Sequence, residues 1–111
     1  MYAIRPRRVQ VTGESMRPAL LPGDRLLVVR ARRLRVGDVV AVSDPRHPAR
    51  LMVKRVAAVD PSGVTVVGDD PSASTDSRQF GPVPSALVRG RVVYRYAPPN
   101  RVGAALKAMG L

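Results

Sequence analysis

The stretch LMVKRVAAVDPSGVTVVG, residues 51–68, decides the fold class of this chain. Its first half is rich in Val, Leu and Met, the turn sequence DPSG follows, and a second valine-rich run completes it. β-Branched residues on both sides of a short Pro-Gly turn are typical of two antiparallel strands joined as a hairpin. Because side chains alternate along a strand, Lys54 and Val56 are expected on the face opposite to Leu51 and Val53.

Further valine-rich runs lie on both sides of this hairpin. They predict strands at residues 8–12, 25–30, 39–43 and 86–96, the last with a bulge at Gly90. Short strands separated by turn sequences predict a mainly β fold, either a small coiled antiparallel sheet or a partly open barrel.

Proline-rich and polar segments separate the predicted strands and mark the end of the predicted domain. Residues 44–50 and 69–84 are expected to be loops because Pro, Asp and Ser dominate them. One domain is predicted at residues 1–98, followed after a proline pair by a tail or short helix at residues 99–111.

The composition excludes several classes of protein. The 111 residues contain no cysteine, so disulfides and thiolate metal sites are excluded, and the single histidine gives no metal-ligand set. No apolar run approaches the about 20 residues that a membrane-spanning helix needs, and the N-terminus lacks the apolar segment of a secretory signal. We therefore expect a cytoplasmic protein without metal or cofactor.

The formal net charge of +11 comes mainly from arginine. Such a charge attracts nucleic acid, an anionic membrane surface or an acidic partner. Aromatic residues make up only 4% of the chain, and no aromatic-rich strand accompanies the arginines to stack bases. We expect no specific nucleic-acid binding, although a non-catalytic basic binding module and a peripheral contact with a membrane both stay open.

The stretch VTGESMRPALLPGD, residues 11–24, places Ser15 at an irregular bend. A nucleophilic serine needs a base, and Lys54 is a candidate because apolar neighbours on a strand would lower its pKa and favour the neutral amine. Serine–lysine pairs are a known variant of nucleophilic catalysis. In isolation Ser15 is equally explained as a turn residue, and Lys54 as a lysine that protects a strand edge.

The segment 69–84 is more polar than a hairpin connection requires. Within it, Ser74 is placed to hydrogen-bond the Lys54 amine and orient it. Asp76 and Arg78 would point the same way on an extended segment and could form an ion pair that stiffens the loop. A flexible polar loop is the alternative.

Three of these stretches, in this order, resemble the type I signal peptidases. SMRPALLPGD from Ser15 resembles the nucleophile box of that family, MVKRV at 52–56 its lysine box, and GDDPSASTDSR at 68–78 its Gly-Asp box. The resemblance implies the signal peptidase/LexA-like fold in a minimal version without an accessory domain. It also implies a serine endopeptidase that removes leader peptides from precursor proteins.

The resemblance assigns a role to each matching residue. Ser15 matches the nucleophile and Lys54 the general base, while Ser74 matches the serine that positions the lysine. Asp76 and Arg78 match a supporting salt bridge.

The backbone of Ser15 and of Gly13 matches the oxyanion hole. An extended substrate, small near the cut, would lie between residues 9–13 and 51–54. The side chains expected to contact it are Val11, Met16, Met52 and Val53.

The subfamily that looks most similar is the nickel-type superoxide dismutase maturation proteases, which implies that precursor as the partner. A signal peptidase I-like enzyme acting on secretory precursors at a membrane is the alternative. The self-cleaving LexA-like repressors also carry a Gly-x-Ser-Met start. They need an Ala-Gly cleavage site upstream of the serine, and residues 1–14 contain none.

Overall fold

A computed structural model describes residues 7–103. Six strands form one antiparallel sheet: β1 (Arg7–Gln10), β2 (Arg25–Val29), β3 (Val39–Asp44), β4 (His47–Asp60), β5 (Gly63–Val67) and β6 (Val88–Ala97). The helical segments are short: η1 (Pro71–Ala73), α1 (Ser77–Phe80), η2 (Ser85–Leu87) and η3 (Pro99–Arg101). The strand order is β1-β2-β6-β3-β4-β5, and the sheet does not close into a barrel. The predicted mainly β fold is confirmed.

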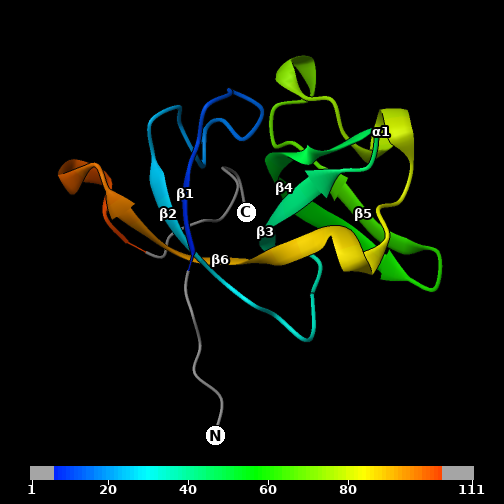
Figure 1. Ribbon diagram of the computed structural model, residues 1–111. Coiled ribbons are helices and arrows are strands. Elements are labelled where there is room, and N and C mark those ends of the chain that lie inside the picture. Colours follow the sequence, from blue (N-terminus) through cyan, green and yellow to red (C-terminus); the bar gives the residue numbers. More distant parts are fainter. Residues whose placement is uncertain (1–6, 104–111) are drawn as a thin grey trace, which may run out of the picture.

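Strand β6 joins the two halves of the sheet. It pairs with β2 through residues 91–97 and with β3 through residues 88–91, and it runs beneath both halves in Figure 1. The register slips next to Gly90, where a side chain would lie 2.5 Å from Val29 O. The register shift agrees with the predicted bulge. A glycine is required at this position because β2 approaches too closely for a Cβ atom.

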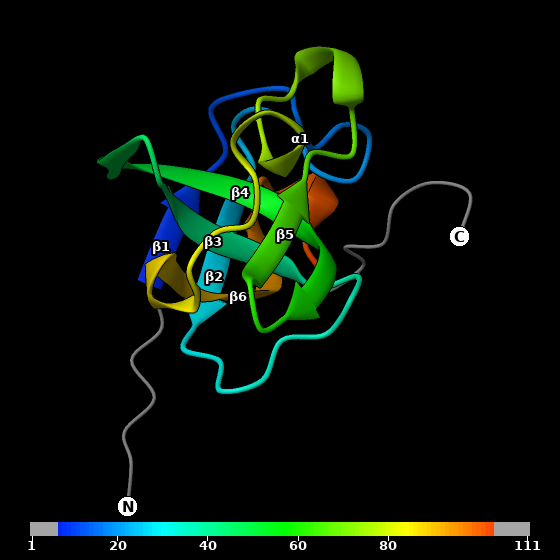
Figure 2. The same ribbon diagram turned by 90° about the vertical axis from the view of Figure 1, so that its right-hand side faces the viewer.

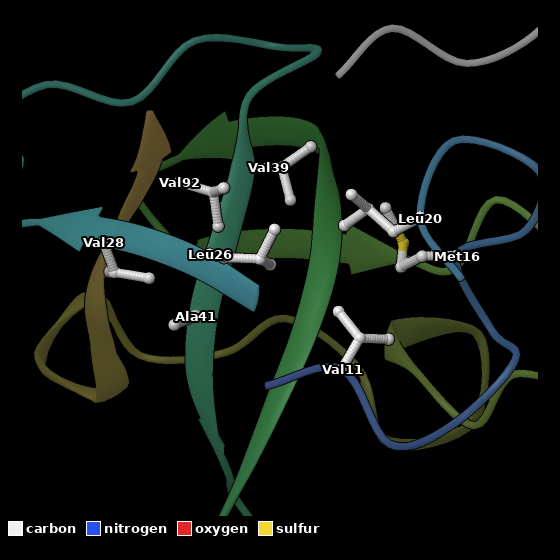
Figure 3. Packing of buried hydrophobic residues seen from close by; sticks show 8 residues of the cluster. All are labelled: Val11, Met16, Leu20, Leu26, Val28, Val39, Ala41 and Val92. Atoms are coloured by element: carbon white, nitrogen blue, oxygen red, sulfur yellow. The ribbon is translucent and has the colours of Figure 1, made fainter. Parts of the chain in front are cut away.

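Strand β3 is buried on both faces, as a continuous apolar run predicts. Val39 and Ala41 belong to a core cluster that includes residues of β2, β6 and the segment 11–24 (Figure 3). Val40 and Val42 face a second cluster built by β4, β5 and Val83. We call these the first and the second core cluster.

Two segments that were predicted to be loops contain regular secondary structure. Strand β4 begins at His47 rather than Leu51, since Asp44 pairs with His47 and turns the chain tightly. Strand β5 pairs only within Arg55–Asp60, so residues 51–54 pair with β3 alone among the described strands. Pro48 also lies outside the residues that pair with β5, and it is tolerated because an unpaired edge needs no N–H donor.

The segment 69–84 is the second such case. It contains η1 and α1, and Val83 returns to the core and bridges to Val64. Asp76 and Arg78 do not lie on an extended segment as predicted, because Asp76 is the N-cap of α1.

The predicted boundary at residue 98 stays a prediction. Residues beyond it contact the sheet, since Gly103 exchanges two backbone hydrogen bonds with Arg95 on β6. Most of the predicted tail or helix, residues 104–111, lies outside the described residues.

Candidate active site

The Ser15 loop is anchored by its apolar neighbours. Met16 and Leu20 are fully buried in the first core cluster, and Val11 closes the base of the loop by backbone hydrogen bonds with Gly23 and Asp24. Ser15 itself is half-buried between these anchors. The irregular sequence thus holds Ser15 at the surface while the residue after it is fixed in the core.

Lys54, on β4, lies on the face of the sheet opposite to the first core cluster, which anchors the Ser15 loop. It pairs with Val40, so its side chain shares the face of the second core cluster with Met52 and Val56. Only 4% of Lys54 is exposed. Its Nζ donates a hydrogen bond to Ser74 Oγ at 2.9 Å. The predicted contact between Lys54 and Ser74 is therefore present.

The hydrogen-bond direction at Ser74 is fixed by Asp76. Ser74 Oγ lies 2.5 Å from Asp76 Oδ2, and a carboxylate only accepts, so the Ser74 hydroxyl donates to Asp76. Ser74 Oγ can then only accept from Lys54. A neutral Lys54 that donates one hydrogen to Ser74 keeps its lone pair for another partner.

Asp76 stays ionised because several donors surround it. Burial alone would raise the pKa of the Asp76 carboxyl, but hydrogen bonds from Arg78, Ser74 and the Gly68 N–H outweigh burial and hold that pKa far below its usual range. Arg78 contributes two side-chain contacts, Nε to Oδ1 at 2.9 Å and Nη2 to Oδ2 at 2.5 Å. The predicted ion pair forms, although on a helix N-terminus.

The pKa of Lys54 is lowered from its ordinary value of 10.5. Burial is the main cause, since the ammonium loses its hydration. The Asp76 carboxylate acts in the opposite direction, while Arg50 and Arg78 lower the pKa further. The neutral amine is thus easier to reach than in an exposed lysine.

Gly68 brings the Ser15 loop and the Ser74 segment together. A methyl group on Gly68 would lie 2.3 Å from Ser74 Oγ and 2.7 Å from Ser15 O, so both atoms flank the same point. Asp70 N–H donates to Ser15 O at 2.8 Å. In both Figure 1 and Figure 2 the two segments lie at the same end of the molecule.

A cleft of about 460 Å³ lies between two walls, residues 7–16 and residues 50–54. Ser15 and Lys54 both line it, as does Gly13. The four side chains predicted to contact substrate also line this cleft. Three of them, Val11, Met16 and Met52, are buried and form its apolar base, whereas Val53 is half-buried.

Three groups in the cleft have no hydrogen-bond partner among residues 7–103. The Ser15 hydroxyl makes no hydrogen bond with a described residue, and the Lys54 amine donates to Ser74 instead. The N–H groups of Gly13 and Ser15 likewise donate to no described acceptor. Such groups are open to a substrate, and catalytic hydrogen bonds often tighten only when one binds.

Sequence reasoning missed the ion pairs that support the site. Asp24, which ends the Ser15 loop, is buried and paired with Arg95 and Arg101. Arg55, next to Lys54, forms a two-point ion pair with Asp69. The Gly-Asp turns were visible in the sequence, but Arg95 lies 71 positions from Asp24, and no local pattern predicts such a pair.

No metal site accompanies this arrangement in the described part of the chain. No group of three His, Asp or Glu side chains there is placed to hold a metal ion. The cleft itself brings together a serine hydroxyl, a buried amine and backbone N–H donors.

A family model described as signal peptidase, peptidase S26, matches residues 1–67, which include both Ser15 and Lys54. The chain belongs to this family. The family is one of peptidases, which confirms the prediction of a serine peptidase.

Curated relatives agree with this assignment. The chain is 36% identical to the mitochondrial ATP-independent inner membrane protease subunit 1a of Arabidopsis thaliana, over 85% of this chain and 72% of the relative. It is 33% identical to the mitochondrial inner membrane protease subunit 2 of Schizosaccharomyces pombe, over 84% and 66%. The human mitochondrial inner membrane protease subunit 1 is 29% identical, over 86% and 72%.

These names overturn the prediction of a cytoplasmic protein. All three relatives are proteases of a membrane, and none is named as a superoxide dismutase maturation protease. Among residues 7–103, no helix is long and apolar enough to cross a membrane. The prediction failed because it rested on missing segments rather than on any residue that reports location.

Proposed function

We propose that this S26-family peptidase is a serine–lysine endopeptidase that removes leader peptides from precursor proteins at a membrane surface. One observation carries the proposal. The buried Lys54 amine is held by Ser74 and Asp76 so that its lone pair is left over, and it lines the same cleft as the Ser15 hydroxyl. A structural lysine at a strand edge needs neither burial nor this chain of hydrogen bonds.

The reaction follows from the residues in the cleft. Neutral Lys54 takes the proton of Ser15 as Ser15 Oγ attacks the peptide carbonyl carbon, and the carbonyl oxygen becomes an oxyanion. The free N–H groups of Ser15 and Gly13 donate to that oxyanion, and one such donor is commonly worth about 3–4 kcal/mol of barrier. Lys54 then protonates the leaving amine, which leaves an acyl-Ser15 ester.

Hydrolysis of the ester uses the same groups. Neutral Lys54 removes a proton from a water molecule, whose oxygen attacks the ester carbonyl. When the carbon–Oγ bond breaks, Lys54 returns the proton to Ser15 Oγ. The products are the leader with a new carboxyl end and the mature protein with a new amino end.

An extended substrate fits the unpaired edge of β4. Residues 50–54 line the cleft, and β5 does not cover that edge. A peptide that adds a strand there gains main-chain hydrogen bonds independently of its side chains. The apolar base of the cleft then favours small or apolar residues beside the cut.

Two classes of substrate come into question: precursors presented at a membrane, and the nickel superoxide dismutase precursor. The names of the relatives support precursors presented at a membrane. The nickel superoxide dismutase precursor is the narrower candidate, and only the overall likeness of the sequence to that subfamily supports it. Both belong in one substrate panel.

The test uses the purified protein with three precursors: a secretory precursor on anionic vesicles, the same precursor without vesicles, and the nickel superoxide dismutase precursor. The new N-terminus is read by mass spectrometry. Cleavage at one bond is expected to disappear in Ser15→Ala and in Lys54→Ala and to persist in Ser85→Ala, whose exposed serine lies outside the cleft.

Normal turnover by Lys54→Ala would refute the mechanism. Binding of nucleic acid that survives Ser15→Ala, with no cleavage of any precursor, would instead favour the basic binding module.

A further inference from the structure

The outer part of the cleft is strongly basic. Arg7 and Arg8 on β1, Arg46 in the turn between β3 and β4, and Arg50 on β4 line its two walls. Among the described residues, Glu14 is the one carboxylate that lines the cleft, and it is paired with Arg17 at 3.0 Å. The cleft therefore offers a binding peptide a surplus of positive charge beyond the apolar base near Ser15.

Two of the four arginines are occupied by neighbours. Arg46 pairs with Asp44 and lies 5.2 Å from the centre of the Phe80 ring. Arg8 stands 6.0 Å from the centre of the Tyr96 ring. Asp44 neutralises Arg46, and Arg8 lies at the outer limit of a cation–π contact.

Arg50 and Arg7 are different. Both are exposed, and neither forms an ion pair with a residue in the described range 7–103. Arg50 precedes Lys54 by four residues on β4, which at the rise of a strand places it about 13 Å along the strand. Both residues line the cleft. An exposed guanidinium at this position is available to a ligand in the cleft.

We propose that the cleft selects precursors that carry an acidic side chain about four residues from the scissile bond, bound by Arg50 with help from Arg7. This inference rests on the proposed function. A peptide extended along β4 advances at the same rise per residue as β4 itself, so its fourth residue from the cut arrives at Arg50. Carboxylates match the planar, two-point geometry of a guanidinium.

The test compares peptides that differ at one position. A parent peptide cut by the enzyme is made with Glu, Gln or Lys four residues before the cut, and again four residues after it. The kcat/KM for Glu is expected to exceed that for Gln by about fivefold on one of the two sides, as suits a partly exposed ion pair. This ratio should shrink as NaCl is raised, because salt screens exposed charges.

A charge reversal makes the test specific. Arg50→Glu should invert the order, so that the Lys peptide becomes better than the Glu peptide. Arg33→Glu changes the net charge equally but lies outside the cleft, and it should keep the wild-type order. Taking the ratio of two peptides for one enzyme at one pH cancels any change in the protonation of Lys54.

The outcomes are distinguishable from a failure of the proposed function. Equal kcat/KM for the Glu, Gln and Lys peptides on both sides would overturn the inference and leave the peptidase mechanism intact. An inversion that also appears in Arg33→Glu would overturn it as well, since long-range charge would then explain the preference. If no peptide is cut by the wild type, the proposed function fails and this inference with it.

Discussion

The two faces of β3 hold the two halves of the candidate active site in different ways. On one face, the loop of Ser15 is tied down by Met16 and Val11 in the first core cluster, while Ser15 itself carries no side-chain hydrogen bond to a described residue. On the other face, Lys54 is buried beside the second core cluster and hydrogen-bonded to Ser74. The nucleophile is positioned by packing, and the base is positioned and tuned by burial.

This difference means that the two halves should respond differently to mutation. A change on the Ser15 side should alter geometry alone. A change on the Lys54 side should also alter protonation, because burial is the main cause of its lowered pKa. Predictions for variants on each side, in decreasing order of expected effect on kcat/KM, test the comparison.

The largest effect is expected for Lys54→Met. Removing the base should lower kcat/KM by about 10³-fold. The free energy of unfolding at neutral pH should not fall, because methionine fills the same apolar site without burying a charge. Peptide cleavage and urea unfolding of the same samples check both parts. Loss of stability with partly retained activity would make Lys54 structural.

The free energy of unfolding, measured against pH, gives a second test of Lys54→Met. The folded pKa of Lys54 is lowered, so the unfolded chain binds the proton more tightly. Stability contributed by Lys54 is therefore lowest below the folded pKa and rises with pH until the unfolded value of about 10.5 is passed. The wild type should show this rise, and Lys54→Met should lack it.

A smaller loss of kcat/KM is expected for one of two glycines, Gly68 and Gly90, that both lack room for a side chain. Gly68→Ala would push Ser74 and Ser15 apart, so kcat/KM should fall by about 10²-fold in protein that is still folded. Gly90→Ala strains the contact of β6 with β2 instead, and should cost about 1–3 kcal/mol of stability with little change in kcat/KM. Equal activity losses in the two variants would contradict the role of Gly68.

The smallest change in kcat/KM is expected for Met52→Ala and Met16→Ala, which we compare with each other. Each opens a cavity and should cost about 2–5 kcal/mol of stability. Met52→Ala lets water reach Lys54, which raises its pKa and moves the rising limb of the pH–kcat/KM profile to higher pH. Met16→Ala should lower kcat and leave the limb in place. A shift of the limb in both variants would show that the two faces of β3 are not independent.

Local patterns were sufficient for much of the fold. The hairpin of residues 51–68, the buried run of β3 and the bulge at Gly90 all follow from valine content, turn residues and alternation. Local patterns failed where tertiary pairing overrides them. The pairing of Asp44 with His47 extends β4 through a proline, and Asp76 caps a helix inside a predicted loop.

The candidate site divides in the same way. The order and spacing of the three boxes predicted which residues matter, and the structure places Ser15, Lys54, Ser74 and Gly13 around one region. Their catalytic roles remain predictions until the variants are measured. The supporting residues Gly68, Asp70 and Asp24 escaped notice because their importance depends on contacts between distant segments.

The sequence by itself determined that this chain is a mainly β peptidase of the signal peptidase family, because residue types and their order carry that information. Only the tertiary structure decided that Lys54 is buried, that the Ser74 hydroxyl donates to Asp76, and that β5 leaves residues 51–54 of β4 without a partner on one side within residues 7–103. Burial, hydrogen-bond direction and free edges are properties of assembled surfaces. These properties arise when β3 brings the two core clusters together. No short stretch of sequence contains the residues of both clusters.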